Sequence, residues 1–173
     1  MARSSSTILI LTEDYYGPEF FKDLVDRLKR ERFIEVSQRI KSEWFPGKCN
    51  PKLTRMLIPK SHILCKIIVV VDAEGGSKVD AKNRVNQHIP DNLKPVTKYI
   101  VFSYCIEEWI CEGLGIGRSS YQHPVDCLND HLRNTKGEDY EKHMLPDFVE
   151  EIDITRLLNN NQEFRDFLNY LKH

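Results

Sequence analysis

Apolar positions along the chain follow two periods, and together they predict strands alternating with helices. Apolar runs of strand length occur at residues 7–11, 33–40, 66–71 and 96–102. After the first run, apolar residues recur at helical spacing, and Pro18 stands near the start of that helix, where its missing N–H costs nothing. The apolar face of this helix consists of Phe20, Phe21, Leu24, Val25 and Leu28.

Helices are also expected later in the chain. Ser77 is a good N-cap for a helix over residues 78–88. Beyond residue 102 the pattern is helical throughout, with segments at 106–113, 125–133, 145–150 and 164–172. This order predicts an α/β fold with a mostly parallel four-stranded sheet, helices on both faces and a C-terminal helical extension. We expect residues 1–115 to form the core and 116–173 to pack on it, as one domain overall.

The composition of the chain is that of a globular protein. Of 173 residues, 40% are hydrophobic and 29% charged, which is typical of a globular domain. The longest apolar runs have strand length and the N-terminus lacks a signal-like apolar stretch, so we expect no membrane segment. The five cysteines include no Cys-x-x-Cys pair, which favours reduced thiols in the cytoplasm and argues against zinc.

Acidic residues follow two of the predicted strands. Glu13 comes just after the first strand, and Asp72-Ala73-Glu74-Gly75-Gly76 comes directly after the third. Ligands of open α/β sheets bind outside the carboxyl ends of the strands, so these acids are expected to converge there. In extended backbone Asp72 and Glu74 would point the same way, and converging carboxylates suit a Mg²⁺ or Mn²⁺ ion. The alternative is that these acids cap the helices that follow.

Basic residues concentrate in one part of the chain. Residues 22–66 carry 12 Lys or Arg against 5 Asp or Glu, whereas residues 138–173 carry 4 against 9. Trp44 and Phe45 are interleaved with the cations, a pattern that suits phosphate neutralisation and base stacking on DNA or RNA. The candidate nucleic-acid-binding residues are Lys41, Lys48, Lys52, Arg55 and Lys60, together with Lys142 near the C-terminus. The alternatives are solvated helix faces and, for the two aromatic residues, the core.

Several short motifs resemble those of the TOPRIM fold, found in topoisomerases, primases and nucleases of the overcoming-lysogenization-defect type. Glu13 after the first strand and Asp72-x-Glu74 after a later one resemble its two acidic motifs. The stretch 105–111, Cys-Ile-Glu-Glu-Trp-Ile-Cys, resembles the Ile-Glu-Ala-Trp-Leu-Leu segment of a small prokaryotic TOPRIM-like family, some of whose members are encoded beside SMC-type ATPases. Tyr140-Glu141-Lys142 resembles that family's Tyr-x-Lys.

The resemblance implies Mg²⁺-dependent phosphodiester chemistry, as a nuclease or in nucleotidyl transfer. It implies that Asp72 and Glu74 hold the metal, that Glu13 is a general base or acid or a further ligand, and that Glu107 joins the site. Two departures stand out: Asp-x-Glu replaces the usual Asp-x-Asp, and the glycine common beside the first Glu is missing.

Two other functions stay open. A non-catalytic module could bind nucleic acid or protein through the same fold, working with an ATPase partner. A phospho-receiver domain also has acids after its first and third strands, but it requires a lysine after a later strand, and none directly follows residues 96–102. The glycines of residues 113–117 follow a helix and so predict a helix end and turn, with Trp109 in the core.

Overall fold

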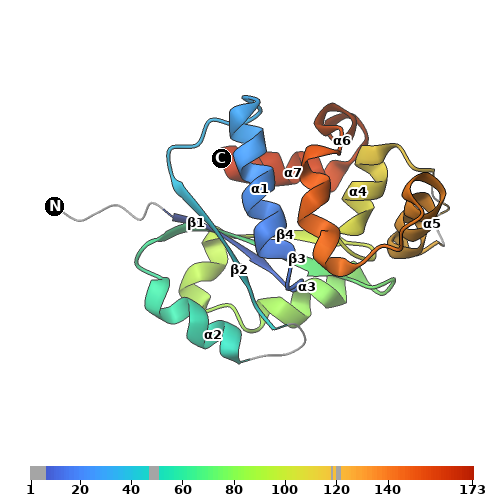
Figure 1. Ribbon diagram of the computed structural model, residues 1–173. Coiled ribbons are helices and arrows are strands. Elements are labelled where there is room, and N and C mark those ends of the chain that lie inside the picture. The colour runs from blue at the N-terminus through green and yellow to red at the C-terminus, as the bar shows by residue number, and fades with distance from the viewer. Residues whose placement is uncertain (1–6, 47–50, 118, 120–121) are drawn as a thin grey trace.

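The computed structural model describes residues 7–46, 51–117, 119 and 122–173. Its centre is a four-stranded sheet in which every strand is parallel to its neighbours (Figure 1). The strands are β1 (Thr7–Thr12), β2 (Arg39–Trp44), β3 (Leu64–Asp72) and β4 (Thr97–Phe102), in the order β2-β1-β3-β4. The predicted fold class is therefore confirmed.

The strand register brings the carboxyl ends of the strands to one edge. Thr12 at the end of β1 pairs with Trp44 of β2 and with Val70 of β3, and Asp72 pairs with Phe102 of β4. Residues that follow β1, β3 and β4 therefore enter loops that share this edge, as the sequence predicted.

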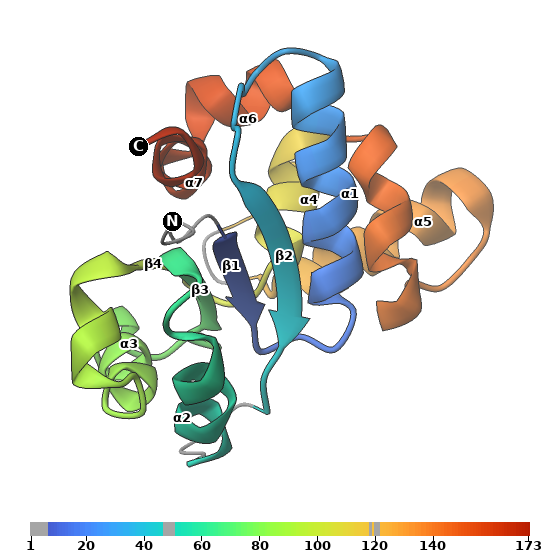
Figure 2. The same ribbon diagram turned by 90° about the vertical axis from the view of Figure 1, so that its left-hand side faces the viewer.

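Helices cover both faces of the sheet (Figures 1 and 2). One face carries α1 (Gly17–Arg30), α4 (Glu107–Leu114), α5 (Pro124–Lys136), η3 (Lys142–Glu150), α6 (Ile154–Asn160) and α7 (Gln162–Lys172). The other carries α2 (Lys52–Leu57), η1 (Ile58–Lys60), α3 (Lys78–Asn86) and η2 (Asp91–Val96). Alternate residues of β1 and β3 point into the two resulting cores, which is why both strands are almost wholly apolar.

Trp109 is the centre of the larger core. Its fully buried ring packs edge-on against Phe102 of β4 and Phe164 of α7, with centroids 4.9 and 5.0 Å apart. Phe21 of α1 and Phe167 of α7 complete the aromatic cluster. Residues before and after position 115 thus share a single core, and Trp109 is a core residue as predicted.

The local signals at helix ends are confirmed. Pro18 lies in the first turn of α1, and the Ser77 hydroxyl accepts a hydrogen bond from the Asp80 N–H at the start of α3. Gly115 ends α4 in a left-handed conformation, so the glycines of residues 113–117 do form a helix end. Among the described residues, no helix is long and apolar enough to cross a membrane.

The predicted strand at residues 33–40 is wrong in its position. Arg32 takes a left-handed conformation, and the N–H groups of Phe33 and Ile34 both bond to the carbonyl of Leu28, closing the end of α1. The apolar residues that suggested a strand therefore seal a helix end. The actual strand, β2, is a largely polar edge strand whose position depends on pairing with β1.

Candidate acidic site

A pocket of about 480 Å³ lies at the carboxyl edge of the sheet. It is lined by three of the predicted acids, Glu13, Asp72 and Glu74, and by residues from the loop after β1, from α3 and from η3. The full set is Glu13, Asp14, Tyr15, Tyr16, Asp72, Glu74, Arg84 and Lys142. The pocket thus unites residues from four parts of the chain, the turn after β1, the end of β3, α3 and η3.

The acids Glu13 and Asp14 of the β1–α1 turn have different surroundings. The Asp14 carboxylate accepts a hydrogen bond from the Tyr16 N–H at 2.8 Å, and the Thr12 hydroxyl bonds the Asp14 carbonyl. Asp14 therefore holds the turn that leads into α1, but it does not cap the helix, because the N-cap is Tyr16 and no described residue makes a side-chain capping hydrogen bond there. Glu13 and Asp14 both line the pocket.

Glu13 forms an ion pair with Arg84 of α3. The two guanidinium nitrogens lie 3.3 and 3.4 Å from the two carboxylate oxygens. Burial raises the pKa of Glu13 above its ordinary value, although Arg84 and the backbone amide of Asp72 act in the opposite direction. The surroundings of Glu13 therefore set its proton affinity, and Arg84 and the Asp72 amide hold its carboxylate next to Asp72.

The Asp72 carboxylate is partly buried, and the Lys142 charge acts on it without a direct contact. Among the described residues Asp72 makes no side-chain hydrogen bond or ion pair, and it is the last residue of β3. Burial, followed by the negative charge of Glu13, raises the pKa of Asp72 to about 8. A partly buried acid next to another carboxylate favours either a proton or a cation at neutral pH.

Glu74 lines the pocket, but its backbone conformation differs from the predicted one. It lies beyond the end of β3 with φ of +48°, so the extended backbone assumed for Asp72-x-Glu74 is wrong. The turn is held to the loop after β4, because the N–H groups of Glu74 and Gly75 bond the carbonyls of Tyr104 and Ser103. Gly75 has φ of +80°, where a side chain would be strained and a Cβ would lie 3.0 Å from the Tyr104 ring.

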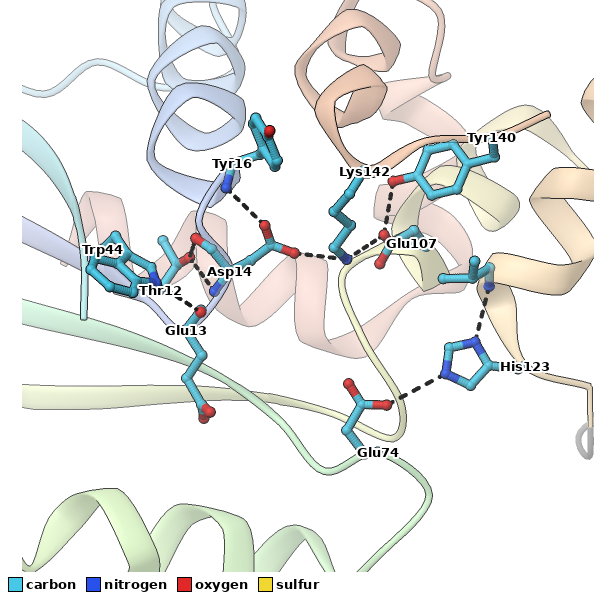
Figure 3. A network of polar contacts seen from close by, with 11 residues as sticks. Thr12, Glu13, Asp14, Tyr16, Trp44, Glu74, Glu107, His123, Tyr140 and Lys142 are labelled. Carbon is cyan, nitrogen blue, oxygen red and sulfur yellow. Dashed lines mark hydrogen bonds and ion pairs between the residues drawn. The ribbon is translucent and has the colours of Figure 1, made fainter. Parts of the chain in front are cut away.

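The Glu74 carboxylate points toward His123, which precedes α5 (Figure 3). Its Oε2 lies 3.4 Å from His123 Nε2. The Val125 N–H donates to His123 Nδ1, so in the neutral ring the hydrogen is on Nε2 and faces Glu74. Histidines gave no sequence signal for this site, and only the packing of α5 against α4 brings His123 there.

Lys142 connects Asp14 with Glu107 (Figure 3). Its ammonium lies 2.7 Å from Asp14 Oδ2 and also contacts Glu107 Oε1, which accepts a second hydrogen bond from the Tyr140 hydroxyl at 2.8 Å. Burial disfavours the charged form of Glu107, yet the Lys142 charge and these hydrogen bonds lower its pKa below the ordinary value. The pKa of Lys142 is raised, because the two carboxylates outweigh the effect of burial.

The network contains two residues for which the sequence predicted a role, Glu107 and Lys142. Glu107, expected to join the metal site, is fully buried with Lys142 and Tyr140 as partners. Lys142, expected to bind nucleic acid, lies at the pocket with both of its carboxylate partners in place. It comes from η3 and not from the end of β4, where a phospho-receiver domain would require a lysine.

The acids do not form a ready three-ligand cluster. Within the described ranges, no group of three or more His, Cys, Asp or Glu side chains is arranged to hold a metal ion. The pair of carboxylates at Asp72 and Glu13 still provides hard oxygen ligands, and Mg²⁺ in proteins is commonly held by one or two carboxylates plus water and phosphate oxygens. Asp72, partly buried and without an ion pair to a described residue, therefore fits such an ion.

The predicted basic residues occupy several elements. Lys41 lies on β2, Lys52 and Arg55 lie on α2, and Lys60 ends η1, where it pairs with Glu43 of β2 at 2.5 Å. Lys48 lies outside the described residues. The two aromatic residues of this segment differ in exposure: Phe45 is buried in the smaller core, whereas Trp44 is 43% exposed.

Sequence reasoning missed Arg84 as a component of the site. A weak signal existed, since Arg84 follows Ala81 by three residues and precedes Val85, so it lies near the face of α3 that packs on the sheet. That spacing identifies a side chain close to the sheet, but it does not specify Glu13 as the partner.

Searches against protein-family models, curated proteins and solved structures gave no match for this chain.

Proposed function

We propose that the pocket binds Mg²⁺ or Mn²⁺ and carries out phosphodiester chemistry on nucleic acid, as a TOPRIM-type nuclease or in nucleotidyl transfer. The observation that carries this proposal is the pair Glu13 and Asp72 in one pocket, with the Asp72 carboxylate partly buried and without a hydrogen bond or ion pair to a described residue. The TOPRIM-like motifs add the expectation of nucleic acid as substrate.

Asp72 is the principal candidate ligand, and Glu74 lines the same pocket. A bound ion would supply phosphate neutralisation and a water of lowered pKa. Glu13 is suited to accept or donate a proton, because burial shifts its pKa upward toward neutrality. Arg84, already beside Glu13, offers a guanidinium to a phosphate oxygen. Lys142 contributes positive charge, but it is shared between Asp14 and Glu107.

The decisive test is binding of Mn²⁺ to the purified protein, measured by calorimetry or electron paramagnetic resonance. We expect binding at millimolar Mn²⁺ or below, lost in Asp72→Ala and weakened in Glu13→Gln. Asp91→Ala is the matched control, because Asp91 is an exposed acid paired only locally with Lys94. Absence of Mn²⁺ binding to the unmodified protein would overturn the proposal.

Activity is measured on single-stranded and duplex DNA and RNA with Mg²⁺ or Mn²⁺, and with EDTA as control. We expect cleavage or transfer that Asp72→Ala and Glu13→Ala abolish.

A second candidate is a non-catalytic module that binds nucleic acid or protein, working with an ATPase partner of the SMC type. The observation that favours it is charge compensation: Arg84 already neutralises Glu13, and Lys142 is held by Asp14 and Glu107. Under this alternative the purified protein binds nucleic acid without turnover, and Asp72→Ala leaves that binding unchanged.

A further inference from the structure

Two exposed aromatic rings stand beside the acidic pocket. Tyr15 is 70% exposed and Trp44 is 43% exposed, and their ring centroids lie 5.8 Å apart at an angle of 69°. Tyr16 continues the group, 5.2 Å from Tyr15. Single exposed apolar residues are ordinary on a protein surface, but contacting aromatic rings at the rim of a polar pocket indicate a binding role.

The aromatic group is fixed to the backbone of the acidic site. The Trp44 indole N–H donates to the carbonyl oxygen of Glu13 at 3.1 Å, as Figure 3 shows. The N–H of the next residue, Phe45, donates to the Thr12 carbonyl at 3.0 Å, and Phe45 is anchored in the core. Trp44 is thus held next to Glu13 by its buried neighbour Phe45 and by a hydrogen bond. Its ring is exposed to solvent but fixed in position.

Two of the three rings line the same pocket as the acids, and Trp44 adjoins it through its hydrogen bond to the Glu13 carbonyl. Tyr15 and Tyr16 line the pocket together with Glu13 and Asp72, and Arg84 and Lys142 add two cations. A ligand that contacts both the rings and the charged groups needs a flat apolar face to pack on a ring. It also needs an anionic group to bind the cations and a metal. A nucleobase joined to a phosphate has both features.

We propose that Tyr15 and Trp44 form a stacking platform for an unpaired base of a nucleic-acid strand whose phosphate lies at the acidic pocket. One ring offers its open face to the base, and the other, at 69° to it, contacts the edge of the base. This inference rests on the proposed function and specifies its substrate class as single-stranded nucleic acid. Bases in a duplex present their faces to one another, so a ring of the protein can stack fully only on a base that is unpaired or flipped out. A protein partner fits less well, because stable interfaces bury about 800 Å² per partner and this group comprises only three rings.

The experiment compares oligonucleotides of equal charge. Binding of a fluorescently labelled 12-nucleotide single strand is measured by anisotropy at low salt, once in EDTA and once with Ca²⁺ in place of Mg²⁺, beside an abasic strand of the same length and the matching duplex. We expect the intact strand to bind about 5- to 150-fold more tightly than the abasic strand, the range that one stacked base contributes. Tryptophan fluorescence should be quenched on binding, and Trp44 is the reporter because Trp109 is fully buried.

Variants test the platform directly. Trp44→Ala and Tyr15→Ala should remove most of the preference for the intact strand, and Trp44→Phe, which keeps a ring, should retain part of it. Ile58→Ala is the control, since Ile58 is a 57% exposed apolar side chain outside the pocket. Equal affinity for intact and abasic strands, or no binding of either, overturns the platform. Because that comparison uses the unmodified protein, it does not depend on the folding of any variant.

The same preparations separate this inference from the metal proposal. If Mn²⁺ binds at Asp72 while intact and abasic strands bind equally, the platform is wrong and the metal site stands. If the intact strand is preferred and Mn²⁺ does not bind, the platform stands and the catalytic proposal is wrong.

Discussion

At the scale of single residues, Asp72 and Glu107 are both acids withdrawn from solvent, and they differ in how their charge is compensated. Glu107 has Lys142 and Tyr140 as partners, and its pKa is lowered. Asp72 makes no hydrogen bond or ion pair with a described residue, and burial and the Glu13 charge raise its pKa to about 8 although the Lys142 charge acts in the opposite direction. Glu107 therefore has a structural role, whereas Asp72 can still bind a proton or a cation.

The raised pKa of Asp72 predicts how stability depends on pH. Between the unfolded value of 3.8 and the folded value of about 8, the native state binds a proton that the unfolded state lacks, so stability of the metal-free protein should fall as pH rises. Asp72→Asn should remove this dependence and stabilise the protein at pH 9 by about 1–3 kcal/mol. Urea unfolding from pH 5 to pH 9 in EDTA measures it. A slope that persists unchanged in Asp72→Asn would contradict the assignment.

Removal of the Lys142 charge should destabilise the protein. Lys142→Met leaves Glu107 fully buried without its cation, at an expected cost of about 2–3 kcal/mol, reduced from the full value because Lys142 is partly exposed. The double variant with Glu107→Gln should recover most of the loss, which a double-mutant cycle by thermal unfolding would show. Lys136→Met is the control, because Lys136 pairs with Glu151 on the surface and should matter little.

At the scale of elements, the turn between β1 and α1 determines where Glu13 and Asp14 lie. α1 begins at Gly17, and a Cβ there would stand 2.0 Å from the Thr12 hydroxyl oxygen. That hydroxyl bonds the Asp14 backbone, so Gly17 is required for the close approach that shapes the turn. The start of a helix and the geometry of the site are therefore linked through one glycine.

Gly17→Ala tests this link. The added methyl must displace Thr12 or the helix start, with an expected loss of about 1–3 kcal/mol and a weaker affinity for Mn²⁺ than in the unmodified protein. Gly117→Ala is the matched control, since a Cβ there meets no atom within 4 Å. Unchanged stability and Mn²⁺ affinity in Gly17→Ala would show that the turn tolerates the displacement.

At the scale of the whole molecule, the helical extension is part of the core. Trp109 of α4 lies between Phe102 of the sheet and Phe164 of α7, and the Arg27 guanidinium of α1 donates to the carbonyls of Val149 and Ile152. The extension also supplies Lys142 and His123 to the acidic site. Residues 116–173 thus complete both the core and the pocket.

This packing predicts that the chain unfolds as one unit. Near-ultraviolet circular dichroism, which reports the packed Trp109 cluster, and far-ultraviolet circular dichroism should give the same midpoint in urea. A chain ending at residue 160 lacks Phe164 and Phe167 and should lose the near-ultraviolet signal altogether. Two separated transitions would instead indicate that residues 1–115 fold alone.

The sequence by itself determined the class of fold and the edge of the sheet where the acids lie. Strand-length apolar runs alternating with helical periods are local patterns, and in a parallel sheet the residues that follow β1 and β3 must share one edge. Helix ends at Pro18, Ser77 and Gly115 were equally local and were predicted correctly. These features depend on near neighbours in the chain, and periodicity and propensity therefore report them.

Only the tertiary structure decided which charges meet. The pairing of Glu13 with Arg84, of Glu74 with His123 and of Lys142 with Glu107 joins residues 35 to 71 positions apart. Edge strand β2 also depended on its neighbour, because its polar sequence carries little strand signal without β1 beside it. Ion pairs and edge strands are set by distances across the folded molecule, which no local pattern of polar and apolar residues encodes.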